Sequence, residues 1–172
     1  DFGKEAGENV KALKRSTNHD VKAVEYYLRD NFKKDRVLNQ LIPYIHFGCT
    51  SEDINNLAYS TMLKEARDCF ILPSLESLSN LLRLLANRFA TIGMLSRTHG
   101  QPASPTTMGK EFLNFHSRIE RLLNKLAKVS IKGKFNGATG NYSAHKVTFP
   151  NINWPITSKR FINSLNISEN KY

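Results

Sequence analysis

The chain has 172 residues, of which 40% are hydrophobic, enough for the core of one domain or of one domain and a piece of another. Its net charge is +10, from 25 Lys and Arg against 15 Asp and Glu. The basic residues are spread along the chain without interleaved aromatic residues, which disfavours a nucleic-acid partner and leaves an anionic small substrate open. Because no uninterrupted run of about eighteen apolar residues occurs, we expect no membrane partner.

The two cysteines and the first residue bear on the cellular compartment. Cys49 and Cys69 form no metal-binding or disulfide pattern, which is typical of reduced thiols and predicts a cytoplasmic protein. The chain starts at Asp1 with charged residues and shows no signal peptide. We interpret the missing initiator methionine as a sign that the chain is a piece of a longer protein.

The first part of the chain predicts short helices. Residues 1–17 have a weak helical pattern, and residues 21–34 have a clear one, with Asp20 suited to the N-cap. Residues 35–41 indicate a short helix or turn. Pro and Gly interrupt the next stretch, so we place a domain boundary near residue 46.

Three longer helices follow, and their apolar residues recur at steps of three and four. The first begins at Thr50 or Ser51, with Asp53 where a capping box has its acid, and runs to about residue 69. Pro73 fits the first turn of a second helix or a kink in a continuing one. We expect the second helix to end near Gly93, which would be its C′ residue, and the third helix to run from Thr106 to about residue 129. The apolar seam of the second helix consists of Leu75, Leu78, Leu82, Leu85 and Phe89, and that of the third consists of Phe112, Phe115, Ile119, Leu122 and Leu126. The fold class is therefore all-α.

The remaining segments are irregular or short. Ser96–Ala103 is a polar segment between two long helices, where His99 and Thr98 can face a cleft. Residues 133–144 contain three glycines but lack the Lys-Ser/Thr ending and the preceding strand of a phosphate loop. Irregular backbone that permits close approach is the better interpretation there. A last short helix is predicted over residues 154–165, followed by a polar tail.

The side chains suit general acid–base chemistry. No pair of the five histidines has metal-ligand spacing, so no metal site is predicted, and no nucleophile elbow is present. Histidine beside hydroxyls and helix N-termini suits proton transfer on an anionic substrate. Thr50 and Ser51 form either an ordinary helix start or a mouth for a carboxylate or phosphate. For Asn18, His19 and Asp20 we favour a polar cap with a surface histidine, and we interpret His46 and His116 as structural.

Four motifs resemble the adenylosuccinate lyase family of the aspartase/fumarase superfamily. They are TNHDVKAVEY from Thr17, HFGCTSEDINN from His46, SRTHGQPA from Ser96, and GATGNY from Gly137 with the Ala144-His145 pair. The resemblance implies an all-helical homotetramer with shared active sites and no cofactor. It also implies β-elimination of fumarate from adenylosuccinate, giving AMP, and from succinylaminoimidazole carboxamide ribotide.

The resemblance assigns roles to matching positions. His99 corresponds to the general acid, and His19 assists through substrate contact. Thr50 and Ser51 match residues that hold the succinyl carboxylates. Asn18 and Asp20 would line the nucleotide side, with Thr98 and Gln101 as neighbours of the acid.

Two family features are missing from the sequence. The G-S-S-x-M-P-x-K-x-N signature that carries the family's serine base does not occur, and neither does the upstream Arg-Tyr pair that binds phosphate. We therefore expect residues 1–46 to be the end of an N-terminal helical domain and 47–172 the first half of the central bundle, inactive by itself. The alternatives are another fumarate-releasing lyase, such as argininosuccinate lyase or fumarase, or a non-catalytic basic helical scaffold.

Overall fold

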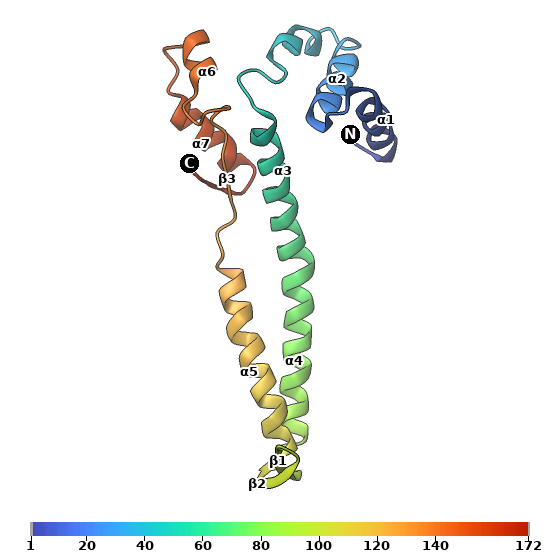
Figure 1. Cartoon of the computed structure of the whole chain (residues 1–172), viewed down its shortest axis with the longest axis vertical. Coiled ribbons are helices and arrows are strands. Elements are labelled where there is room, and N and C mark those ends of the chain that lie inside the picture. The colour runs from blue at the N-terminus through green and yellow to red at the C-terminus, as the bar shows by residue number, and fades with distance from the viewer. Residues whose placement is uncertain (1, 172) are drawn as a thin grey trace. The chain divides into compact units, whose positions relative to one another are not determined.

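The computed structural model describes residues 2–171, and helices dominate it (Figure 1). This agrees with the predicted all-α class, since the strands form only two small two-stranded sheets within the described part. Contacts divide the chain into two compact units, one of Asp1–Thr61 with Lys132–Tyr172 and one of Met62–Ile131. The boundary proposed near residue 46 concerns the domains of a longer protein and stays a prediction.

Two packed helices open the first unit. α1 (Lys4–Thr17) ends at Asn18, which adopts a left-handed conformation with φ 51° and donates its N–H to Lys14 O. α2 (Asp20–Phe32) follows at once. The predicted N-cap was wrong by one residue: His19 is the cap and its side chain accepts from the Lys22 N–H, whereas Asp20 begins the helix and accepts from the Val21 N–H.

A buried carboxylate ties α2 to the next segment. Glu25 contacts Lys22 at 2.8 Å, Arg29 at 3.0 Å and His46 Nδ1 at 2.8 Å. Burial alone would raise the pKa of Glu25, but the hydrogen bonds from Lys22 and His46 and the charges of Lys22 and Arg29 outweigh it and lower the pKa. This cluster holds His46 just beyond the short 3₁₀ helix Leu38–Tyr44, in keeping with a structural role for that histidine.

One uninterrupted helix runs from Ser51 to Arg88, made of α3 (Ser51–Ala66), a π-helical turn (Arg67–Ile71) and α4 (Leu72–Arg88). Pro73 lies in the first turn of α4 but does not separate two helices, so the continuing-helix alternative is the one observed. A proline lacks the N–H that an α-helical turn needs, and the π-helical turn ends two residues before Pro73. The helix ends at Arg88, so the predicted end at Gly93 was wrong.

Gly93 instead begins a β-hairpin. β1 (Gly93–Thr98) pairs antiparallel with β2 (Gln101–Thr107), and Thr98 lies opposite Gln101. His99 and Gly100, with φ 48° and 77°, form the two-residue connection, which is the type I′ pattern of tight hairpins. The prolines of β2 are tolerated because both strands of a two-stranded sheet are edge strands.

α5 (Met108–Ala127) returns alongside α4 (Figure 1), and its N-cap is Thr107 rather than the predicted Thr106. The Thr107 side chain accepts the Lys110 N–H at 3.2 Å. Buried His116 on α5 lies 2.9 Å from the Ser79 hydroxyl of α4, which supports its structural interpretation.

The last part of the chain completes the first unit. β3 (Lys132–Gly133) pairs in parallel with β4 (Ser168–Glu169), so the predicted polar tail contributes a short strand. α6 (Ser143–Thr148) and α7 (Trp154–Ser164) lie between them, and α7 has Asn153 as its N-cap. The core of this unit includes Leu57, Trp154, Ile162 and Ile167.

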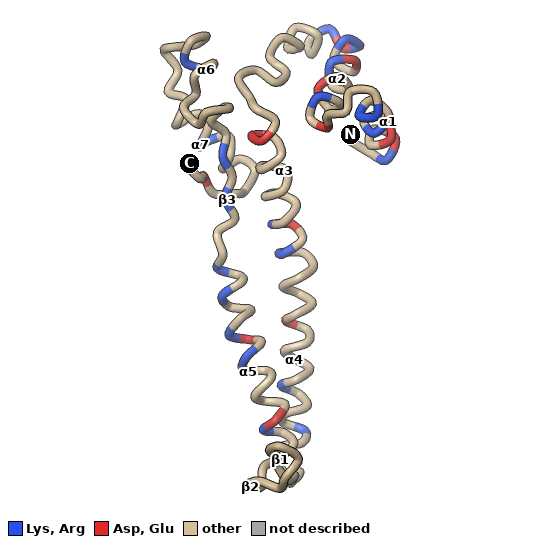
Figure 2. Tube along the Cα trace, viewed as in Figure 1, with Lys and Arg blue, Asp and Glu red and all other residues tan. Residues whose placement is uncertain are grey.

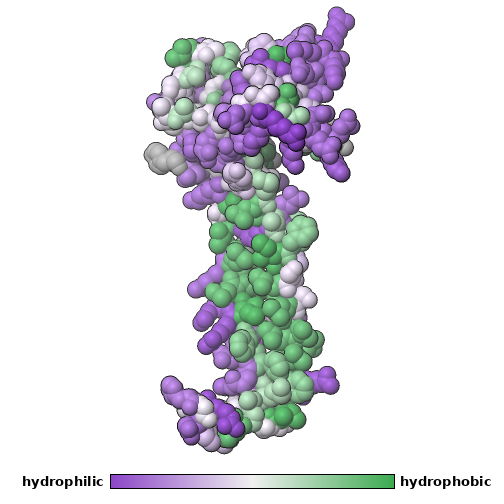
Figure 3. Space-filling model, turned by 45° about the vertical axis from the view of Figure 1, so that its right-hand side comes forward, coloured by the Kyte–Doolittle hydropathy of each residue, from purple (hydrophilic) through white to green (hydrophobic). Residues whose placement is uncertain are grey.

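Lys and Arg are distributed over many elements, including α1, α2 and α5, and are not gathered in one arm (Figure 2). Apolar side chains, by contrast, gather along one face of the long helices (Figure 3). Phe70 is 68% exposed and Leu84 is 62% exposed. A continuous exposed apolar surface of this kind marks a region that another surface covers.

By length and composition alone, Ser51–Arg88 could cross a membrane, because it contains an 18-residue window with a mean hydropathy of 1.3. The expectation drawn from uninterrupted apolar runs overlooked this window, whose scattered polar residues do not lower its mean hydropathy enough. The same pattern also belongs to helices that pack in an assembly.

A close approach of α5 to the end of α4, at Gly109, yields a first prediction. A Cβ added at Gly109 would lie 2.4 Å from Ala86 O and 2.6 Å from the Cα of Ala90. Gly109→Ala must therefore push the two helices apart, and we expect a loss of about 1–3 kcal/mol in the free energy of unfolding. Gly7→Ala in α1, where a Cβ meets nothing within 4 Å, is the control and should be neutral or stabilising. Equal urea-unfolding curves for the two variants would contradict the close packing.

Candidate functional site

The centre of the first unit is the carboxylate of Asp53, which is 0% exposed and lies in the first turn of α3. Its Oδ2 accepts the Thr50 N–H at 3.0 Å and the Gly137 N–H at 3.0 Å. Its Oδ1 accepts the Asn136 N–H at 3.2 Å, and Lys134 Nζ lies 3.8 Å away. The predicted capping-box contact is thus present, and the same carboxylate also holds the start of the glycine-containing loop.

Two hydrogen bonds join the segment before the loop to Asn56, which lies one helical turn after Asp53 in α3. Asn56 Nδ2 donates to Lys134 O at 3.0 Å, and Asn56 Oδ1 accepts the Lys134 N–H at 2.8 Å. The loop then turns back on itself, since the Tyr142 N–H donates to Asn136 O at 2.9 Å. Loop residues 136–142 therefore lie beside the N-terminus of α3.

His145 lies beneath this loop and is 1% exposed. Its ring contacts the rings of Phe47, Phe135, Tyr142 and Trp154, and within residues 2–171 neither ring nitrogen has a hydrogen-bond partner. Gly48, with φ 65°, lies so close that a Cβ there would be 2.6 Å from the ring. Only glycine combines this conformation with this contact.

Burial sets the protonation of two groups here. It lowers the pKa of His145, and the negative charge of Asp53 opposes the shift without reversing it. Burial raises the pKa of Cys49 to about 11, with a further contribution from Asp53. A thiol held protonated is a poor nucleophile, so Cys49 is unsuited to covalent catalysis.

At the mouth of α3 the structure brings His19 next to Ser51, with His19 Nε2 3.3 Å from Ser51 Oγ. Because His19 Nδ1 accepts the Lys22 N–H, the neutral ring carries its proton on Nε2 and donates it to Ser51. Exposed Asn18 and Asp20 flank this histidine, and Thr50 precedes Ser51 in half-buried surroundings. Five of the predicted site residues therefore gather in the first unit.

The other three predicted residues belong to the second unit. His99 occupies the tip of the β1–β2 hairpin and is exposed, and Thr98 and Gln101 form the strand pair that closes the turn. The segment predicted as a loop is thus an ordered hairpin, which holds the imidazole of His99 at its end.

Sequence reasoning missed the partners of Asp53. Asn136 and Gly137 are separated from it by 83 and 84 positions, and only the glycines themselves indicated that another segment comes close. No group of three His, Cys, Asp or Glu in the described residues is placed to hold a metal ion.

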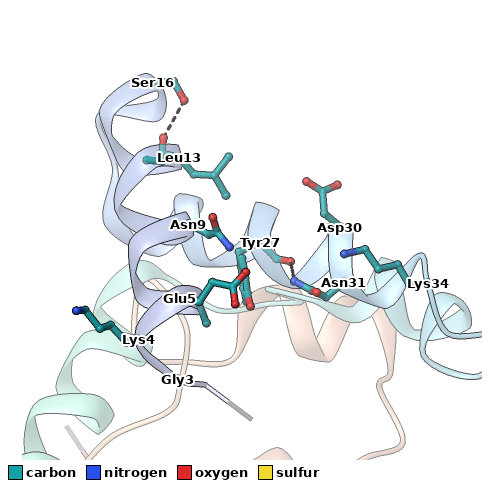
Figure 4. A pocket seen from close by; sticks show the side chains of 12 residues that line it. Gly3, Lys4, Glu5, Asn9, Leu13, Ser16, Tyr27, Asp30, Asn31 and Lys34 are labelled. Atoms are coloured by element: carbon teal, nitrogen blue, oxygen red, sulfur yellow. Dashed lines mark hydrogen bonds between the residues drawn. The ribbon is translucent and has the colours of Figure 1, made fainter.

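One hollow lies elsewhere, between α1 and α2 (Figure 4). It measures about 830 Å³ and is lined by Glu5, Asn9, Tyr27 and Lys34 among others, but by none of the predicted site residues. A smaller hollow of about 480 Å³ borders the loop at Gly140 and Asn141 and is lined by Lys146, Lys159 and Lys171.

A protein family described as Lyase matches residues 1–160, so the chain belongs to this lyase family. Its curated relatives include adenylosuccinate lyases from Legionella pneumophila strain Corby, Escherichia coli strain K12 and Vibrio cholerae. They are 48%, 47% and 49% identical over 99%, 99% and 95% of the chain. The resemblance inferred from the four motifs is confirmed. The chain spans only 38%, 38% and 36% of the lengths of these relatives.

Solved structures agree on the fold. The 3-carboxy-cis,cis-muconate lactonizing enzyme from Pseudomonas putida matches with a TM-score of 0.78 and 20% sequence identity. The match covers 95% of this chain and 36% of the chain of that enzyme. The fumarate lyase from Mesorhizobium sp. BNC1 has a TM-score of 0.75 with 20% identity, covering 94% and 36%.

The buried His145 predicts a pH dependence. Its folded pKa is lowered from 6.5, so the unfolded chain binds a proton below about pH 6.5 that the folded chain does not. The contribution of His145 to stability is therefore complete above that pH and is lost as the pH falls. Between pH 7 and pH 5 we expect wild-type stability to fall more than that of His145→Phe, measured by urea unfolding. Parallel falls would contradict a neutral buried ring.

Proposed function

We propose that the complete protein is an adenylosuccinate lyase. It releases fumarate from adenylosuccinate to leave AMP, and from succinylaminoimidazole carboxamide ribotide. The observation that supports the proposal is the 47–49% identity to adenylosuccinate lyases over nearly all of this chain.

The reaction is a β-elimination on the succinyl group. A base removes a proton from the carbon beside one carboxylate, and the electron pair forms the carbon–carbon double bond of fumarate. The carbon–nitrogen bond breaks, and an acid protonates the departing nitrogen. We assign the acid to His99, whose exposed position on the hairpin tip leaves the imidazole accessible to a substrate.

The remaining predicted residues receive binding roles. Thr50 and Ser51 hold the succinyl carboxylates, and His19, bonded to Ser51, orients the substrate. Asn18 and Asp20 line the nucleotide side, and Thr98 and Gln101 support the acid. Hydroxyls at a helix N-terminus favour carboxylates because the helix dipole is positive there. The chemistry requires no metal or cofactor.

We further propose a homotetramer with shared active sites. The exposed apolar face of α4 supplies a surface for other helices of such an assembly. Both cysteines are free, which agrees with a cytoplasmic setting.

A substitution at His99 tests the proposal. His99→Asn places Asn-Gly at the type I′ turn, the preferred pair there, so the hairpin should keep its stability while the acid is lost. In the full-length protein we expect adenylosuccinate turnover to fall by a factor of about 10²–10⁴. The assay follows fumarate release, and thermal unfolding verifies the fold.

The 172-residue chain by itself is the negative control, because it lacks the serine signature, and we expect no turnover from it. Near-normal turnover by His99→Asn would remove His99 from its role. Failure of the wild-type protein to cleave adenylosuccinate, with turnover of argininosuccinate or malate instead, would replace the proposed substrate.

A further inference from the structure

We infer that Asp53 is a positioning residue for the fumarate side of the active site, acting through the backbone of Thr50 and of loop residues 136–137. The inference rests on the proposed function, because it concerns the same helix mouth. Asp53 has no exposed atoms and therefore no access to substrate, yet it sets how tightly the succinyl group is held.

The Asp53 carboxylate joins two segments of the chain through its hydrogen bonds. Its three backbone donors come from two distant segments, with Thr50 on one side and Asn136 and Gly137 on the other. An ionised carboxylate accepts at both oxygens and donates from neither, so Asp matches this donor set fully. Asparagine would turn an NH₂ group toward at least one N–H and lose that bond.

The donors of Asp53 lie on both sides of the proposed carboxylate site. The Thr50 N–H belongs to one of the two residues to which we assign the succinyl carboxylates, the other being the adjacent Ser51. Because Asp53 fixes this N–H, it fixes the backbone from which both hydroxyls project. The loop that shares the carboxylate also packs on Gly48, since a Cβ at Gly137 would lie 3.4 Å from Gly48 O. Residues on both sides of the Thr50 mouth are therefore held by one group.

The burial of Asp53 indicates that this residue has a role beyond capping α3. An ordinary capping-box acid lies at the surface, where water satisfies its remaining lone pairs. Removing a carboxylate from water is costly unless hydrogen bonds replace the water. The segment from β3 to the loop is already fastened to α3 by Asn56, so attachment alone does not require Asp53.

Asn56 therefore provides a matched control. It joins the same two segments through two hydrogen bonds with Lys134, and it also donates to the Glu52 and Asp53 carbonyls of α3. The N–H groups of Thr50 and Gly137 donate instead to the Asp53 carboxylate. Both Asp53→Asn and Asn56→Ala should lower the thermal unfolding temperature. Only Asp53→Asn should disturb the mouth. A merely structural role would make the two variants alike in ligand binding.

The experiment uses the full-length protein and two probes, fumarate and AMP, with dissociation constants from calorimetry. For Asp53→Asn we expect fumarate to bind about tenfold or more weakly and KM for adenylosuccinate to rise similarly, because supporting residues typically contribute factors of this size. AMP affinity should stay within about twofold. Asn56→Ala should retain wild-type affinity for both probes.

Gly137→Ala carries the test if Asp53→Asn fails to assemble. It strains the loop backbone, where φ is 82°, without touching the carboxylate, and should weaken fumarate binding in the same direction. Unchanged fumarate affinity in a folded Asp53→Asn or Gly137→Ala variant would overturn the inference alone. Wild-type protein that neither cleaves adenylosuccinate nor binds fumarate would overturn the proposed function, and this inference with it.

Discussion

The start of α3 and the loop beside it depend on one buried carboxylate, that of Asp53. Asp53 receives backbone N–H groups from the start of α3 and from a loop more than 80 residues later. Around it lie Gly48, His145 and the aromatic rings that enclose the imidazole, so polar and apolar contacts converge on the same helix mouth. The N-terminus of α3 is consequently held by contacts from several segments, which suits the proposed carboxylate site.

The helices could be predicted because their signals are local. Apolar spacing identified the long helices, and Asp53 was correctly placed in a capping box. The errors at Asp20 and Thr106 were of one residue, since neighbouring side chains compete for the same cap. The hairpin was missed because its tight turn has His99 at a position with positive φ, where Asn or Gly is the usual signal.

The site could be predicted only in part. Resemblance of the motifs predicts roles for His19, Ser51 and His99, but no local pattern reports which backbone amides a carboxylate meets after the chain has folded back. Asn136 and Gly137 are such partners of Asp53, and their contact depends on the path of the whole helical hairpin between them. The exposed apolar face of α4 could not be predicted for a similar reason. Hydrophobic spacing predicts that a helix face is buried, but it does not show which other surface covers that face.

Amide hydrogen exchange at Asn136 and Gly137 in the ligand-free protein tests the central claim most directly. Both residues lie outside helices and strands, yet the buried carboxylate of Asp53 accepts their N–H groups. We predict that these amides exchange as slowly as those in the interior of α3, and much faster in Asp53→Asn. Rapid exchange in the wild-type protein, at the rate of an unstructured loop, would contradict the account.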